Sequence, residues 1–159
     1  MRSFATALFV AGATAVATDF PRFDSMHAHC AMNVTFEGVT CNSLYQLVDY
    51  QVRAFENGDK CSQPGFYGVF EENESSYVWS TRETANKKYV DDQLFEFTQS
   101  GNTCQVAAKS RSQSLSYYDY SVNYCNMWNI LSEVGTFTID SVKDCKYPAD
   151  DPTSVCARY

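Results

Sequence analysis

Three aspartates near the middle of the chain are of a type that can carry acid–base or metal chemistry. Asp91 and Asp92 are adjacent at the expected start of a strand, and Asp119 follows a segment rich in Ser and Tyr. Carboxylates brought together can act as general acid and base, or bind calcium if further oxygen ligands join them. A tandem Asp before a strand is also typical of a turn that accepts backbone hydrogen bonds. Both interpretations are kept as hypotheses.

Lys109 and Arg111 form a basic pair on one face of an expected strand, because alternate residues of a strand point the same way. They could bind a carboxylate, sulfate or phosphate group of a ligand. The alternative is that they pair with Asp91 or Asp92 on the neighbouring strand.

A tyrosine cluster, Tyr117, Tyr118, Tyr120 and Tyr124, follows this strand. A tyrosine has a flat apolar ring and a polar tip, which suits contact with a sugar ring, an apolar ligand or a protein surface. The same rings could instead form an edge of the core. The predicted ligand-binding residues are Lys109, Arg111, Tyr117, Tyr118, Asp119 and Asn123.

Signatures of nucleophilic and metal sites are missing from the sequence. The serines at 110, 112, 114 and 116 lie in no G-x-S-x-G motif, and the two histidines, His27 and His29, are far from them along the chain. No C-x-x-C or His-x-x-x-His spacing predicts a zinc site. We therefore predict no metal and no cofactor.

Residues 1–17 have the features of a secretory signal: Arg2, a short apolar run, and the cleavage sequence Ala15-Val16-Ala17. The run is too short to span a bilayer, so no membrane span is predicted. Residues 18–29 are expected to be a flexible arm, and residues 30–159 a single domain. The formal charge of −7 would become −8 (−7 − 1) on loss of Arg2, which argues against a nucleic-acid partner.

Seven cysteines in an exported chain predict disulfides, with one cysteine left over. The expected pairs are Cys41–Cys61, Cys104–Cys125 and Cys145–Cys156. Cys30 would then be the spare cysteine and could form a covalent dimer. Two triplets, beginning at Asn33 and Asn73, match the N-glycosylation sequence.

Hydrophobic spacing predicts the secondary structure. A helix capped by Ser43 carries an apolar stripe and stops at Asn57-Gly58. A second helix begins at Asp119 and ends at Gly135. Strands are expected at residues 33–40, 66–71, 77–82, 93–98, 103–114 and 136–142, followed by a disulfide-pinned tail.

These elements predict an α+β fold. Four strands joined by short turns form an antiparallel meander, giving a four- or five-stranded sheet with both helices on one face, stapled by disulfides. A closed antiparallel barrel is the alternative. The capped helix between the early strands argues against it.

The stretch from Tyr89 to Asn123 resembles the domain-of-unknown-function family 1499, a family with no established activity. Three blocks carry the resemblance, in the family's order: Tyr89-Val90-Asp91-Asp92 with Phe95, Lys109-Ser110-Arg111-Ser112-Gln113, and Asp119-Tyr120-Ser121-Val122-Asn123. The family has Gly where this chain has Ser121, and basic residues where it has Tyr124 and Cys125. The resemblance implies a fold more than a function.

The functional hypothesis is a secreted binding or interaction module that uses the tyrosine and serine corner and the sheet face. Its partner would be a small molecule, a glycan or a protein. Two alternatives remain: a hydrolase or metal-dependent enzyme centred on Asp91, Asp92 and Asp119, and a structural component of a secreted assembly.

Overall fold

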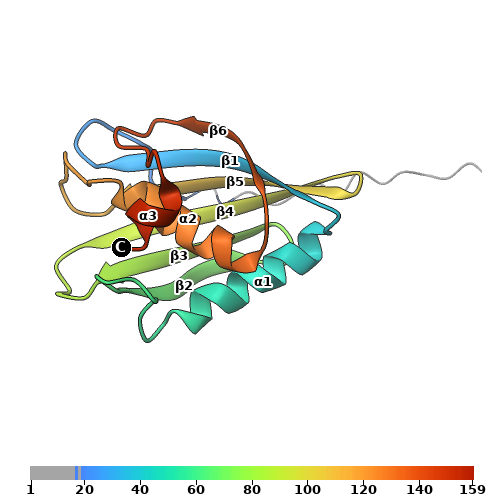
Figure 1. Ribbon diagram of the computed structural model, residues 1–159, viewed down its shortest axis with the longest axis horizontal. Helices are drawn as coiled ribbons and strands as arrows, with labels where there is room; N and C mark the ends of the chain where they lie inside the picture. Colours follow the sequence, from blue (N-terminus) through green and yellow to red (C-terminus); the bar gives the residue numbers. More distant parts are fainter. Residues whose placement is uncertain (1–16, 18) are drawn as a thin grey trace, which may run out of the picture.

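The computed structural model describes residue 17 and residues 19–159, so the expected signal sequence lies almost wholly outside the described residues. Nine elements follow one another along the chain (Figure 1). They are β1 (His29–Glu37), α1 (Cys41–Ala54), β2 (Gly65–Asn73), β3 (Tyr77–Thr84), β4 (Val90–Ser100), β5 (Thr103–Ser112), α2 (Val122–Val134), β6 (Thr138–Lys143) and α3 (Pro152–Cys156).

The strands form one open six-stranded sheet in the order β2-β3-β4-β5-β1-β6, with antiparallel neighbours throughout. The α+β class and the central meander are confirmed. The expected number of strands and the alternative closed barrel are wrong. The first and last strands both add to the β5 side of the meander, since β1 pairs with β5 and β6 pairs with β1. Sequence periodicity identifies a strand but not its partner.

The helices cover one face of the sheet, as Figure 1 shows for α1 and α2, and α3 packs on α2. α1 begins one turn earlier than predicted because Thr40, not Ser43, is its cap: the Thr40 side chain accepts a hydrogen bond from the Ser43 N–H at 3.2 Å. α1 also ends before Asn57, at Ala54. None of the helices in residues 19–159 is long and apolar enough to cross a membrane.

The core lies between the helices and the sheet. Val34 of β1, Val48 of α1, Phe95 of β4 and Ile130 of α2 are fully buried within it. Towards the end of the sheet where β5 finishes and α2 starts, the buried side chains become polar. This polar end holds most of the predicted site.

Three disulfides form, but all three expected pairings are wrong. The bonds are Cys30–Cys145, Cys41–Cys104 and Cys125–Cys156, and Cys61 is the free cysteine. Strand order explains the difference. β6 runs antiparallel to β1 with Lys143 opposite Ala31, which brings the following cysteine beside Cys30. A covalent dimer through Cys30 is therefore excluded while this bond is intact.

Candidate functional site

A groove of about 440 Å³ opens at the polar end of the sheet, beside the start of α2. We call it the tyrosine groove, because four of its lining residues are tyrosines. Its aromatic and aliphatic walls are exposed: Tyr117, Tyr118 and Tyr120 are each at least 60% accessible. The lining residues are Thr84, Tyr89, Asp91, Ser112, Leu115, Ser116, Tyr117, Tyr118, Asp119, Tyr120 and Val122.

Beneath the groove, five buried side chains close a ring of hydrogen bonds between the sheet and α2. Ser112 Oγ donates to Asp91 Oδ1 at 2.7 Å, and Asn126 Nδ2 donates to Asp91 Oδ2 at 2.9 Å. Asn126 Nδ2 also donates to Ser110 Oγ, whose hydroxyl donates to Asn123 Oδ1 at 2.8 Å. Asn123 Nδ2 completes the ring at Ser112 Oγ, 3.3 Å away. These bonds fix the orientation of the Asp91 carboxyl at the floor of the groove.

Burial raises the pKa of the Asp91 carboxyl, and its hydrogen bonds from Ser112 and Asn126 oppose that rise. The Asp91 side chain belongs to a residue only 3% exposed, yet it lines an open groove. A carboxyl in this position favours the neutral form more than an exposed one does.

Asp119 connects the ring to the start of α2. Its Oδ2 accepts hydrogen bonds from the backbone N–H of Asn123 at 3.1 Å and from Asn123 Nδ2 at 3.0 Å. The structural N-cap is Ser121, which makes no side-chain capping bond, so Asp119 satisfies a first-turn donor from outside the helix. The chain reaches the helix through two left-handed residues, Tyr120 at φ 51° and Ser121 at φ 73°. This turn holds Tyr120 beside the groove.

The aromatic rings contact one another and a lysine from the tail. Tyr118 packs edge-on against Tyr117, with ring centroids 5.0 Å apart, and also approaches Tyr120 and Tyr147. The Lys146 ammonium lies 3.0 Å from the centroid of the Tyr117 ring. A hydrogen bond with that lysine lowers the pKa of Tyr117. The rings are thus partly ordered before any ligand binds.

The structure divides the predicted site residues between the two faces of the sheet. Asp91, Asp119, Asn123, Tyr117 and Tyr118 come together at the tyrosine groove. The other three predicted residues, Asp92, Lys109 and Arg111, belong to the opposite face, where each has a partner.

On that opposite face, Asp92 accepts a hydrogen bond from Trp79 Nε1 at 3.0 Å. Lys109 pairs with Glu96 at 2.7 Å, and Arg111 pairs with Asp24 at 2.8 Å. The basic pair therefore contacts acidic groups, although not the two aspartates that the sequence predicts as partners.

The segment before β1 contacts the sheet through Asp24. Its carboxylate accepts hydrogen bonds from Arg111 Nη2, from His27 Nδ1 at 2.8 Å, and from the Met26 N–H. The bond from Arg111, followed by that from His27, holds the pKa of Asp24 well below its usual range. His27 also forms an isolated β-bridge with Ser116.

A second groove, of about 500 Å³, is lined by Asp24 and His27 and shares Ser116, Tyr117 and Asp119 with the tyrosine groove.

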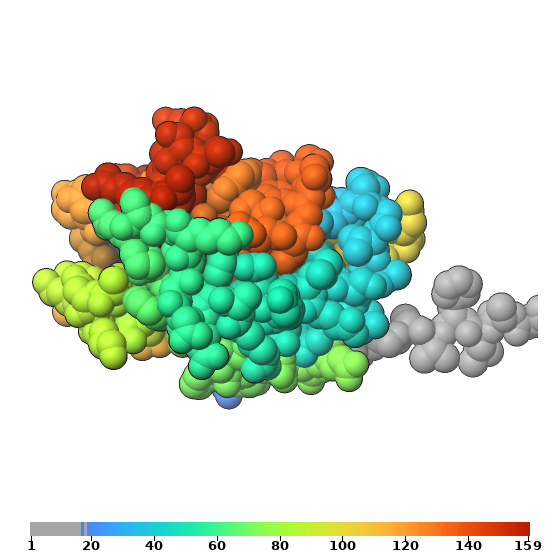
Figure 2. Space-filling view, turned by 60° about the horizontal axis from the view of Figure 1, so that its bottom comes forward, coloured from blue at the N-terminus to red at the C-terminus, as the bar shows by residue number. Residues whose placement is uncertain are grey.

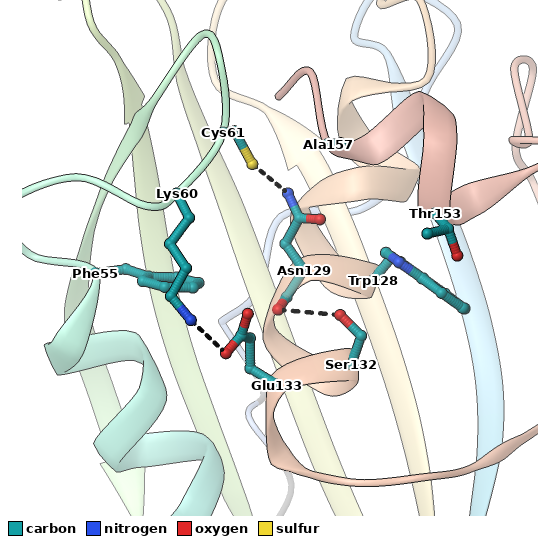
Figure 3. A pocket seen from close by; sticks show the side chains of 9 residues that line it. All are labelled: Phe55, Lys60, Cys61, Trp128, Asn129, Ser132, Glu133, Thr153 and Ala157. Atoms are coloured by element: carbon teal, nitrogen blue, oxygen red, sulfur yellow. Dashed lines mark hydrogen bonds and ion pairs between the residues drawn. The ribbon is translucent and has the colours of Figure 1, made fainter.

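The free cysteine lies in a separate pocket between the loop after α1 and helices α2 and α3 (Figure 3). Asn129 Nδ2 is 3.4 Å from Cys61 Sγ, and Lys60 pairs with Glu133 at 2.9 Å. Burial raises the pKa of the Cys61 thiol to about 12. The thiol therefore stays protonated near neutral pH and is a weak nucleophile.

Sequence reasoning missed two residues of the polar end. Asn126 belongs to the ring, and its spacing of three from Asn123, which puts both side chains on one face of the helix, was the available signal. Arg82 is buried on the inner face of β3, in register with Asp91, and its alternation with Val78 and Ser80 was the signal there.

Across residues 17 and 19–159, no three His, Cys, Asp or Glu side chains are grouped so that they could hold a metal ion.

Comparison with known proteins gives likeness of fold alone. No family model matches the sequence, and no curated protein matches it significantly, so membership of the domain-of-unknown-function family 1499 stays a prediction. The crystal structure of DynU16, from the dynemicin biosynthetic locus, has a TM-score of 0.49 and 5% identity over 70% of this chain and 46% of DynU16. CalU16 from Micromonospora echinospora has a TM-score of 0.46 and 8% identity over 67% of this chain and 74% of CalU16. This chain thus spans about half the length of DynU16.

Proposed function

We propose that the protein is a secreted module that binds a small organic molecule in the tyrosine groove. One observation carries this proposal: the ring of hydrogen bonds holds the buried Asp91 carboxyl in place under a set of exposed tyrosines. Exposed aromatic side chains gathered around a few oriented polar groups are typical of ligand sites.

The chemistry of the lining narrows the class of ligand. The groove is lined by two aspartates and by no lysine or arginine. The two carboxylates disfavour anions, while the Lys146 ammonium lies against the Tyr117 ring at the edge of the groove. The groove suits a ligand with a flat face that can lie on a tyrosine and with hydroxyl or protonated amine groups that can donate to Asp91 or Asp119.

Three disulfides are consistent with an oxidising compartment, which supports the secreted part of the proposal. Asn33 and Asn73, the two predicted glycosylation sites, are exposed. We propose that both carry glycans. Intact-mass measurement before and after enzymatic deglycosylation tests this, and an unchanged mass would refute it.

An enzyme centred on three aspartates has less support. Asp91 and Asp119 share the tyrosine groove, but Asp92 belongs to the other face of the sheet and accepts a hydrogen bond from Trp79 there. The three carboxylates therefore do not face one reacting atom.

Saturation-transfer NMR with two probes, phenethylamine and cellobiose, tests the binding function. We expect saturable binding of at least one probe. Tyr118→Ala should weaken that binding by about tenfold, the effect of losing one aromatic contact. The matched control is Tyr50→Ala, which removes another exposed tyrosine, from α1 and away from the groove. Absence of saturable binding, or an equal loss in the control, would rule out the proposed site.

A further inference from the structure

Arg82 is a buried charge with few partners in the protein. The residue is 2% exposed, and its Nη2 donates to the backbone oxygen of Gln63 at 3.3 Å. Its Nε and Nη1 are buried without a hydrogen-bond acceptor. Within residues 17 and 19–159, no carboxylate forms an ion pair with this guanidinium.

The acidic group opposite Arg82 on the same sheet face is already engaged. Asp91 stands directly opposite Arg82 in the β3–β4 register, but its two oxygens accept hydrogen bonds from Ser112 and Asn126. Burial raises the pKa of Asp91, while the charge of Arg82 and the hydrogen bonds from Ser112 and Asn126 oppose that rise. A buried guanidinium that forms no ion pair and leaves two N–H groups without acceptors is costly, so these two groups are available to an acceptor from a ligand.

The fold makes room for the arginine at Gly65. A Cβ atom at Gly65 would lie 2.0 Å from Arg82 Nε, so only glycine allows β2 to pass this close to the side chain. The guanidinium is thus held between β2 and the end of β3. The backbone of Gly65 contacts one side of the guanidinium, and the Gln63 carbonyl accepts a hydrogen bond from its Nη2.

Arg82 lies at a groove of about 450 Å³ that we call the arginine groove. Its lining residues are Ser62, Gln63, Pro64, Arg82, Thr84, Ala85, Asn86, Tyr89, Val122 and Tyr159. Arg82 is the only lysine, arginine, aspartate or glutamate side chain among them. Figure 2 shows the β3–β4 turn (yellow-green) close to the loop that follows α1 (green), and these two segments supply most of the lining.

We propose that the arginine groove binds an oxyanion group, either a carboxylate or a phosphate, with Arg82 as its counterion. The side-chain amide of Asn86 adds a neutral donor beside it, whereas the Thr84 and Ser62 hydroxyls donate to Asn86 Oδ1 and to the Arg158 carbonyl. In a protein with a net charge of −7, a groove with one buried positive charge and no acidic side chain is a distinct environment for an anion.

This site goes beyond the binding function proposed above and does not depend on it. The arginine and tyrosine grooves share Thr84, Tyr89 and Val122, yet one favours anions and the other disfavours them. Anion binding and binding of phenethylamine or cellobiose are therefore separate measurements, and either can fail without the other.

Titration by ¹H–¹⁵N NMR with sodium acetate and with sodium phosphate, at an ionic strength held constant with sodium chloride, tests the proposal. We expect saturable shifts of the Arg82 Nε–H signal and of the Gln63 and Ala85 amides. Saturation by acetate alone identifies a carboxylate site, and saturation by phosphate alone identifies a phosphate site. If neither anion gives more than the response to chloride, the proposal is overturned.

Two variants locate the site. Arg82→Met should abolish the saturable shifts, provided that circular dichroism shows a folded protein. Asn86→Asp leaves Arg82 in place and keeps the Oδ1 that accepts hydrogen bonds from Thr84 and Lys88, but adds a negative charge at the groove. It should weaken anion binding by about fivefold.

The matched control is Asn102→Asp, which makes the same change of charge in the exposed β4–β5 turn at the opposite end of β4. Anion binding by this control should equal that of the parent protein. If Asn86→Asp binds acetate and phosphate as strongly as Asn102→Asp does, the arginine groove is not the site.

Discussion

Asp91 and Asp92 are neighbours in the chain, but their carboxyl groups serve opposite faces of the sheet. Asp91 accepts from Ser112 and Asn126 in the layer between sheet and helix, whereas Asp92 accepts from Trp79 and Gln113 on the other side. Adjacent residues of a strand point in opposite directions, so a tandem pair in a strand supplies one group to each face. Only Asp91 belongs to the tyrosine groove.

We expect Asp91 to make stability fall as the pH rises. Burial raises its pKa above the ordinary 3.8, so the folded protein holds this proton more tightly than the unfolded chain does. The free energy of unfolding therefore decreases as the pH rises from about 3.8 through the raised pKa. Asp91→Asn should remove this decrease, because the amide is neutral at every pH.

Urea unfolding at a series of pH values measures this effect. Asp150→Asn, an exposed aspartate in the tail, is the control and should keep the pH dependence of the parent protein. Parallel pH profiles for the parent and Asp91→Asn would contradict the prediction.

Asp24 should act in the opposite direction. Its hydrogen bonds from Arg111 and then His27 hold its pKa below 3.8, so its contribution to stability is present above that pH and is lost on acidification. Asp24→Asn should be less stable than the parent near neutral pH, and the difference should shrink as the pH falls below about 4. Thermal unfolding at several pH values measures it. A difference that stays constant across this range would show that the Asp24 charge is not responsible.

Gly65→Ala should destabilise the protein by about 1–3 kcal/mol, because the new methyl group would overlap the Arg82 side chain. Gly68→Ala is a matched control on the same strand: its Cβ would meet only Thr81 Oγ1, at 3.8 Å. Chemical denaturation of the two variants provides the comparison. Equal stabilities would mean that Arg82 does not occupy this position.

Ser121→Gly should stabilise the protein. Ser121 adopts φ 73°, a left-handed conformation that costs a residue with a Cβ roughly 1–2 kcal/mol and costs glycine nothing, while glycine loses about 0.5–1 kcal/mol of backbone entropy. The expected net gain is about 0.5–1 kcal/mol. In differential scanning calorimetry this corresponds to a rise in Tm of roughly 1–4 °C. Ser132→Gly, inside α2, should instead lower Tm.

Much of the fold follows from local sequence patterns. The alternation around Phe95 and Phe97 and the turn at Gly101 predict the β4–β5 hairpin, and the apolar stripe through Val48 predicts α1. Strand partners and disulfides do not follow, because they depend on contacts between distant residues. Cys30 and Cys145 are 115 residues apart in sequence and meet only because β6 lies alongside β1.

The grouping of the candidate site residues was predictable where they are close in sequence. The segment from Tyr117 to Asn123 predicts one corner, and the structure places that corner at a groove. Arg82 and Asn126 reach the same end of the molecule from other elements, and their importance comes from burial. Burial of a polar residue depends on the layers that cover it, which no single stretch of sequence specifies.

The disulfide between Cys30 and Cys145 makes the packing of the tyrosine cluster depend on the redox state of the solution. Lys146 and Tyr147, which contact Tyr117 and Tyr118, follow directly after Cys145. A reductant such as glutathione would release this short stretch of tail from β1. The contacts that Lys146 and Tyr147 make with Tyr117 and Tyr118 would then loosen, because this stretch would lose its covalent link to β1.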